Sequence, residues 1–201
     1  MLPLDSPRWT ELRTARGEAG HVPDLLRRLA AEPWTVEQRG RRVAADLWRD
    51  LFLALCWQLP GVVGPIAGAT WAALPHVVEL IPSRPLAERL PALAFVGAVA
   101  AHAPVHGTPV PDLMPDYREA LARAAPLVLE ALCAGAWDEA DTRDLLVALA
   151  AVLGQEGLAR SLDGLPSLDW TGGQWFGACP RCRADLGVDG AGAIRPGGTG
   201  A

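Results

Sequence analysis

Lysine and asparagine are both absent from this chain of 201 residues, so all eighteen of its basic residues are arginines. These absences, together with abundant alanine, leucine, glycine and proline, are typical of a GC-rich genome. They reflect codon usage more directly than they reflect function. The formal net charge is −5 and the sequence pI is about 5.3. A nucleic-acid-binding protein needs a clustered basic face, which this acidic balance argues against. We therefore expect no nucleic-acid partner.

The chain also lacks a clear membrane or export segment. Its first residues show no basic region followed by an apolar run, which a secretory signal needs. The most apolar stretches are residues 50–81, interrupted by prolines and glycines, and residues 89–105, which fall short of the roughly 20 residues that span a bilayer. We expect a cytoplasmic protein without membrane contact, whose four cysteines remain reduced thiols.

Common catalytic and nucleotide-binding motifs are missing as well. The sequence has no G-x-G-x-x-G after a predicted strand, no P-loop, no H-E-x-x-H and no G-x-S-x-G. The glycine-rich residues 61–68 have no neighbouring lysine, and we interpret them as a turn that lets two helices pack closely. The motifs therefore give no support to a specific enzyme class.

Helical patterns fill most of the first 164 residues, because apolar residues recur every three or four positions between proline and glycine boundaries. Ser6 before Pro7 predicts an N-cap, and residues 35–38 fit a capping box that would open a helix reaching residue 58. Residues 102–113 predict a loop. Strand signals are scarce before residue 165, so we expect β structure only in the tail. The expected helices cover about residues 7–16, 23–32, 35–58, 65–81, 86–101, 115–134, 138–153 and 156–162.

A short pattern recurs along these helices: a proline, one variable residue and two apolar residues. It begins at Pro23, Pro75 and Pro126, with separations of 52 and 51 residues. A fixed period of this kind is the signature of an α-solenoid, although HEAT repeats are shorter, at roughly 40 to 47 residues. Pro75 and Pro126 should also kink or break their helices.

Five segments carry a family resemblance, and in chain order they are "WTELRTARGEAGHVPDLLRRLA", "LWRDLFLALCWQ", "GATWAALPHVVEL", "LPALAFVGAVAAH" and "CPRCRADL". Together they resemble a set of HEAT-like repeat proteins that is common in actinobacteria. The resemblance spans about residues 9–186. It implies a stack of helix pairs. It also implies a binding scaffold, since the known HEAT-like proteins include immunity and adaptor proteins. DNA glycosylases built on such repeats are enzymes, but they use a basic concave face.

We accordingly expect an all-α, HEAT-like α-solenoid of seven or eight helices over residues 1–164. A small strand–turn appendage should occupy residues 165–188. Residues 189–201 have almost nothing to bury and should be disordered.

Cys179 and Cys182 form a C-x-x-C in this appendage, the spacing of one zinc knuckle. A closed zinc site needs four ligands, and Cys56 and Cys133 lie in apolar stretches that predict buried core thiols. Three interpretations stay open. The first is a metal-free turn docked on the last helices through Trp175 and Phe176. The second is a zinc site, completed either by two histidines of the helical body or by the same pair in a second chain, and the third is a redox pair or disulfide.

Eight tryptophans outnumber the one tyrosine and three phenylalanines. Core packing explains most of them, but Trp34 before a helix cap and Trp137 between helices are candidates for exposure, which marks binding surfaces. Trp175 and His76 complete the predicted partner or ligand surface. We expect a non-catalytic scaffold that presents a groove to a protein partner. The alternative is a small-molecule-binding protein or enzyme with a pocket lined by Trp and His.

The acidic charge is uneven, since residues 110–159 hold nine acidic residues and three arginines, a net charge of −6. One interpretation is that this stretch steers a basic partner toward the later helices. The other is that it marks the solvated faces of ordinary helices.

Overall fold

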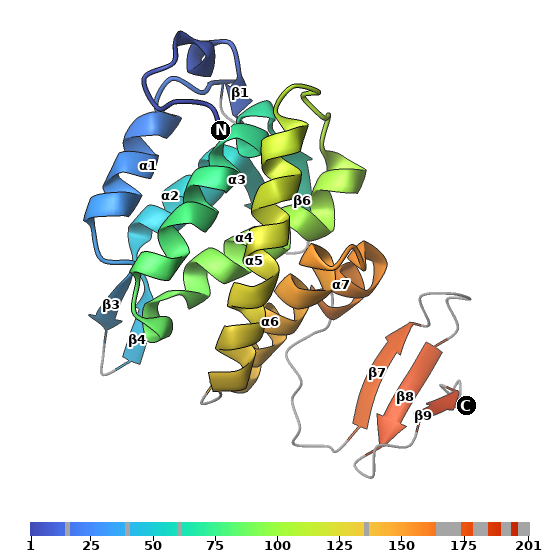
Figure 1. Cartoon of the computed structure of the whole chain (residues 1–201). Helices are drawn as coiled ribbons and strands as arrows, with labels where there is room; N and C mark the ends of the chain where they lie inside the picture. The colour runs from blue at the N-terminus through green and yellow to red at the C-terminus, as the bar shows by residue number, and fades with distance from the viewer. Residues whose placement is uncertain are drawn as a thin grey trace.

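The computed structural model describes residues 1–14, 17–38, 41–59, 62–134, 137–163, 174–178, 185–189 and 194–196. The chain is mostly helical, as predicted. The α-helices within this part of the chain are α1 (Val22–Ala31), α2 (Asp46–Leu55), α3 (Gly68–Leu80), α4 (Leu90–His106), α5 (Met114–Ala134), α6 (Glu139–Val152) and α7 (Glu156–Asp163) (Figure 1). Short 3-10 turns are η1 (Pro7–Thr10), η2 (Ile81–Ser83) and η3 (Leu86–Glu88).

Local sequence signals account for several of these boundaries. The Ser6 side chain accepts a hydrogen bond from Arg8 N, so the predicted cap is confirmed, although it opens the η1 turn. Asp138 caps α6 by accepting from Asp141 N at 2.9 Å. Gly154 has φ +74°, the left-handed conformation that glycine supplies without strain, and it lies just past the end of α6.

The expectation that β structure is confined to the tail is wrong. Three antiparallel pairs precede residue 165, namely β1 (Arg13–Thr14) with β2 (Gly17–Glu18), β3 (Thr35–Gln38) with β4 (Arg41–Ala44), and β5 (Cys56–Leu59) with β6 (Val62–Ile66). Residues 35–38, predicted to cap a helix, form β3 instead, and α2 begins only at Asp46. The strand forms in place of the predicted helix start because of Thr35, Val36 and Val43. Their β-branched side chains favour extended backbone, and Val36 pairs with Val43 across the two strands.

The region around α4 also departs from the prediction. This helix continues to His106, where we predict a loop from residue 102, and the Gly107 N–H still donates to Ala103 O at 2.9 Å. α4 is apolar on all sides, so it must be covered on all sides. It contacts α2, α3, α5, α6, α7 and β6. Within the described ranges, no helix has both the length and the apolarity that crossing a bilayer requires.

Pro75 and Pro126 lie inside α3 and α5, and neither proline breaks its helix. α3 contacts both α1 and α5, while α4 contacts α2 and α6. Of the three helices that carry the recurring proline, α3 therefore contacts the other two, α1 and α5.

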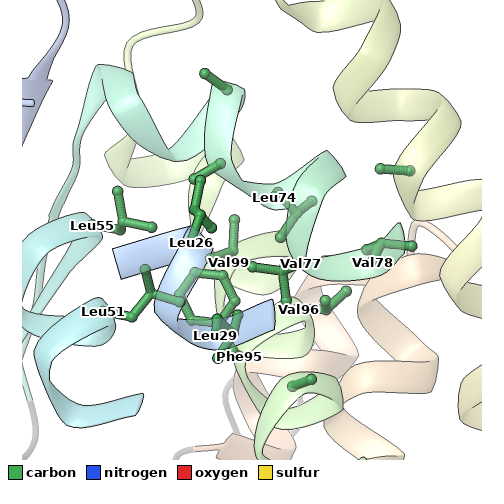
Figure 2. Packing of buried hydrophobic residues seen from close by; sticks show 14 of the residues in the cluster. Leu26, Leu29, Leu51, Leu55, Leu74, Val77, Val78, Phe95, Val96 and Val99 are labelled. Carbon is green, nitrogen blue, oxygen red and sulfur yellow. The ribbon is translucent and has the colours of Figure 1, made fainter. Parts of the chain in front are cut away.

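Large aliphatic side chains from the first four helices meet in one core (Figure 2). Complete burial of such a side chain contributes about 1.5–3 kcal/mol relative to leaving it in water. Trp9, Trp34, Trp48 and Trp71 join the same core with at most 2% of their surface exposed. The residues labelled in Figure 2 are Leu26, Leu29, Leu51, Leu55, Leu74, Val77, Val78, Phe95, Val96 and Val99.

The last described elements form a three-stranded antiparallel sheet in the order β7 (Gln174–Ala178), β8 (Asp185–Asp189) and β9 (Ile194–Pro196). Trp175 pairs with Val188, and Val188 pairs with Ile194. β9 lies within residues 189–201, for which the sequence predicts disorder.

Candidate functional site

A hollow of about 820 Å³ lies among four parts of the helical body. Its walls are the β3–β4 hairpin, α2, the start of α4 with the preceding η3 turn, and the start of α6. The hollow is lined by Thr35, Glu37, Val43, Ala44, Trp48, Arg49, Phe52, Ala87, Leu90, Pro91, Ala94, Trp137, Asp141 and Asp144.

The aromatic wall of the hollow comes from α2. Trp48 and Phe52 are four residues apart, so they lie on the same side of that helix. Both pack against Phe95 of α4, with ring centroids 6.1 Å from Trp48 and 5.0 Å from Phe52. Trp48 is 2% exposed, and its ring meets Trp34 edge to face at 5.3 Å. The wall is therefore anchored in the core and should move little when a ligand enters.

Trp137 faces this wall from the segment before α6. Its indole N–H donates to Ala131 O at 2.7 Å, a carbonyl in the last turn of α5. This bond satisfies the polar edge of the ring and fixes its position. The side chain stays half-buried, as expected of an aromatic residue at a binding surface.

Acidic side chains dominate the polar part of the lining. Asp141 and Asp144 are three residues apart on α6 and lie on one side of it. Glu37 contributes a third carboxylate from the exposed surface of β3. Arg49 is the basic member of the lining, and it already forms an ion pair with Asp46 at 3.3 Å. The described lining therefore carries an excess of negative charge.

Burial raises the pKa of the Asp144 carboxyl above its ordinary value. The neighbouring Arg143 opposes this shift, with its Nε 3.9 Å from the Asp144 oxygen, whereas Asp141, Asp163 and Asp138 add to it. A carboxylate that is costly to ionise gains most from a cation placed beside it. Asp144 is thus the lining residue whose charge a bound cation would stabilise most directly.

The indole N–H of Trp48 is buried, and no acceptor among the described residues reaches it. Leaving such a donor without a partner costs about 1–3 kcal/mol. Trp48 is one of the residues that line the hollow.

The structure places the predicted surface tryptophans differently. Trp137 lines the hollow. Trp34 does not, and the expectation of exposure is wrong: it is completely buried, and its indole N–H donates to Leu29 O at 2.7 Å. It follows a proline and precedes a strand, so it folds back under α1 and supports Trp48 from behind.

His76 lies in α3 and does not line the hollow. Its Nε2 is 2.8 Å from Leu2 O, and its ring centroid is 6.2 Å from that of Trp9. Burial lowers the pKa of His76, while the hydrogen bond to Leu2 partly opposes that shift. We interpret this histidine as an anchor for the N-terminal segment.

The predicted metal ligands Cys179 and Cys182 lie outside the described residues, and Trp175 is placed only as a position in β7. Cys133 is exposed on α5, so the prediction of a buried core thiol is wrong there. Cys56 begins β5, so its predicted place in a helix is wrong. Within the described part of the chain, no cluster of three His, Cys, Asp or Glu side chains could hold a metal ion.

A second polar cluster joins α4 to α7. His102 Nε2 lies 2.9 Å from Asp163 Oδ2, and Arg160 donates to Ala101 O at 2.8 Å. His102 is 7% exposed. These bonds fasten the short α7 to the apolar α4, which is a structural role.

The sequence did not single out Glu37, Trp48, Phe52, Asp141 or Asp144 as site residues. Asp141 and Asp144 belong to the acidic stretch 110–159, and this charge was the only feature of the sequence that pointed to them.

Comparisons with models of known protein families, with curated proteins and with solved structures find no significant match to this chain.

Proposed function

We propose that this protein is a non-catalytic binding module whose hollow accepts a cationic side chain, arginine or lysine, of a protein partner. The observation that carries the proposal is the lining itself, in which the carboxylates of Glu37 and Asp144 stand beside aromatic walls. The single arginine of the described lining is already paired with Asp46.

A bound cation would be stabilised by both the aromatic and the acidic side chains of the lining. The face of a tryptophan attracts a cation by about 0.5–1 kcal/mol at an exposed site and by about 2 kcal/mol or more where water is excluded. Asp144 adds a half-buried carboxylate whose ionisation a cation favours. An anionic ligand would meet repulsion from the carboxylates of Glu37 and Asp144.

Two features of the rim favour a protein as the source of the cation. Val36 on β3 is 46% exposed, next to the lining residues Thr35 and Glu37, and offers an apolar contact outside the hollow. The β3–β4 hairpin forms a two-stranded sheet, so each strand leaves one edge without a ladder partner among the described strands. An extended peptide can pair with such an edge while its side chain enters a pocket.

A small organic cation is the second candidate ligand, because the volume of the hollow suits a molecule of that size. Drug-sized ligands occupy sites of about 300–1,000 Å³, and the hollow is within that range. No histidine is among the described residues of the lining.

The helix-pair arrangement is part of the same proposal. α1, α3 and α5 are successive neighbours, and so are α2, α4 and α6. Two such series are what a HEAT-like stack requires. This neighbour pattern supports the resemblance to HEAT-like scaffolds.

The test is an NMR titration of the indole N–H signals with N-acetyl-arginine amide, and with N-acetyl-glutamate as the anionic probe. We expect the Trp137 signal to shift saturably with the arginine probe alone. Asp144→Asn and Trp137→Phe should each weaken binding about 5–10-fold, consistent with losing a contact of roughly 1 kcal/mol.

Glu139→Gln is the matched control, since it removes one carboxylate from an exposed position on the same helix without touching the lining. Equal binding of both probes would contradict the proposal. So would an equal loss of arginine binding in the Glu139→Gln and Asp144→Asn variants. To separate the two sources of cation, the arginine probe is compared with an extended peptide that contains one arginine. Tighter binding of the peptide supports a protein partner.

A further inference from the structure

The lining of the hollow carries charges of both signs. Glu37 of β3 and Asp144 of α6 supply carboxylates, and Arg49 of α2 supplies a guanidinium group. A ligand with a cation alone uses the carboxylates and leaves the guanidinium without a role in binding. Arginine is well suited to hold a carboxylate, because its planar fork can donate two parallel hydrogen bonds to it. The availability of Arg49 therefore decides whether the ligand carries an anion as well.

The ion pair that holds Arg49 is weak. Its Nη1 lies 3.3 Å from Asp46 Oδ1, three residues earlier on the same helix. The two side chains are 66% and 85% accessible to water. An exposed pair at this spacing on a helix favours the paired arrangement only about twofold. A carboxylate of a ligand can therefore take the place of Asp46 at little cost.

The charges of the lining differ in their exposure. Asp144 and Trp137 are half-buried, whereas Arg49 is exposed. A ligand cation would therefore lie inside the hollow beside Asp144 and Trp137, and a ligand anion would lie at the open edge against Arg49. Glu37 is exposed too, but it belongs to a different wall, the β3–β4 hairpin.

The last residue of a protein chain has this arrangement of charges when it is an arginine or a lysine. Its side-chain cation stands at the end of a flexible methylene stem, and its backbone ends in a carboxylate. An internal arginine or lysine has a neutral amide at that place, which cannot form a charge-assisted pair with Arg49.

We propose that the partner inserts the C-terminal residue of its chain, an arginine or a lysine, and that the α-carboxylate of this residue binds Arg49. This inference rests on the proposed function and narrows the partner from any exposed cationic side chain to a chain end. The side chain enters the hollow, and the terminal carboxylate replaces Asp46 at the guanidinium.

Two probes that differ only at the carboxyl end test this inference. N-acetyl-arginine and N-acetyl-arginine amide both carry the guanidinium, and only the first carries a carboxylate. The chain has a net charge of −5, so general electrostatic attraction favours the amide, which is the more positive probe. We expect the reverse order in an NMR titration of the Trp137 indole N–H. N-acetyl-arginine should bind about 3–5-fold more tightly.

Arg49→Gln should remove this preference, and Arg49→Lys, which keeps the charge, should retain part of it. Arg49 is exposed, so both variants should keep the circular dichroism spectrum and the melting of the unaltered chain. Arg123→Gln is the matched control, because it removes the same charge from an exposed position on α5 outside the described lining. This control should keep the full preference for N-acetyl-arginine.

The possible outcomes separate this inference from the proposed function. If neither probe shifts the Trp137 signal, the proposed function fails and this inference fails with it. If the amide binds as tightly as N-acetyl-arginine or more tightly, the proposed function stands and the chain-end assignment is wrong. A preference for N-acetyl-arginine that survives Arg49→Gln would also overturn the assignment, because another group then holds the carboxylate.

Free arginine carries the same two charges, so it is the remaining source of this chemistry. A short peptide that ends in arginine should bind more tightly than free arginine, because it can also contact Val36 and the edge of β3. The same peptide with an amidated end should lose about the same 3–5-fold. Tighter binding of free arginine than of the peptide would assign the hollow to an amino acid and overturn the assignment to a chain end.

Discussion

Gly97 of α4 lies so close to Ala148 of α6 that a β-carbon on the glycine would be 2.6 Å from the Ala148 Cα. The two helices therefore approach almost backbone to backbone at this point. The approach also positions the hollow, because α4 supplies Leu90 and Ala94 to its lining and α6 supplies Asp144.

Gly97→Ala should consequently destabilise the fold. The added methyl group meets backbone atoms, which cannot turn aside, and overpacking of this kind costs about 1–3 kcal/mol. Urea unfolding would measure it. Gly157→Ala in α7 is the control, since nothing lies within 4 Å of its added carbon, and it should be neutral or slightly stabilising. Equal stability of the two variants would mean that α4 and α6 are not held this closely.

Trp34 and Arg84 form a second structural pair, with the guanidinium 5.1 Å from the indole ring centroid. Arg84 also donates to Leu29 O and Ala30 O at 2.9 and 2.8 Å, at the carboxyl end of α1. Trp34→Ala should cost about 3–5 kcal/mol, as truncations of large buried aromatics do. Arg84→Met keeps much of the side-chain length and loses the charge, and we expect a smaller loss of about 1–2 kcal/mol in urea unfolding. A larger loss for Arg84→Met than for Trp34→Ala would contradict this ranking.

The helices were predictable where local signals decide the structure. Proline, glycine and capping residues mark α1, α6 and α7, and the apolar periodicity between them is regular. The β3–β4 hairpin was not predictable in the same way. "TVEQ" satisfies the spacing of a capping box and also has the β-branched residues of a strand, and only the pairing of Val36 with Val43 decides between them.

The site was less predictable than the fold, because it depends on contacts between distant parts of the chain. Phe52 and Asp144 line the same hollow although about ninety residues separate them. No local pattern links an acidic residue on one helix to an aromatic residue on another. Trp137 was found because it lies between helices, but the same reasoning placed Trp34 at the surface, where the packing of α1 and α2 buries it.

His76 should make stability depend on pH. Its pKa in the folded chain is lowered by burial from an unfolded value of about 6.5. The neutral ring is therefore favoured by folding, and the free energy of unfolding should fall as the pH drops below about 6.5 toward the folded pKa. His76→Gln should flatten this part of the profile in urea unfolding at several pH values. His21→Gln, at an exposed position, should leave it unchanged, and the reverse result would contradict the anchoring role.

The metal state of Cys179 and Cys182 is a separate prediction. Two thiolates cannot complete a four-ligand zinc site, and Cys133 is exposed on α5 rather than buried beside a partner. We expect elemental analysis of the tag-free protein to find no stoichiometric zinc, and Cys179→Ser with Cys182→Ser to leave the melting unchanged. One zinc per chain would contradict this expectation. A half zinc per chain together with a dimeric mass would establish a site shared between two chains.

Asp144→Asn should stabilise the protein while it weakens the binding of a cation. The folded-state pKa of Asp144 lies above its unfolded value, mainly because of burial, so the folded chain holds this proton more tightly than the unfolded chain. The native carboxylate therefore costs stability above the folded pKa, and the cost disappears as the pH falls below the unfolded value of about 3.9. The variant should be more stable than the unaltered chain at pH 7, and the two should converge near pH 3. Urea unfolding at both pH values measures the difference, with Glu139→Gln as the exposed control. If Asp144→Asn proves less stable at pH 7, its carboxylate already has a favourable partner within the chain, and the hollow is not a vacant site for a cation.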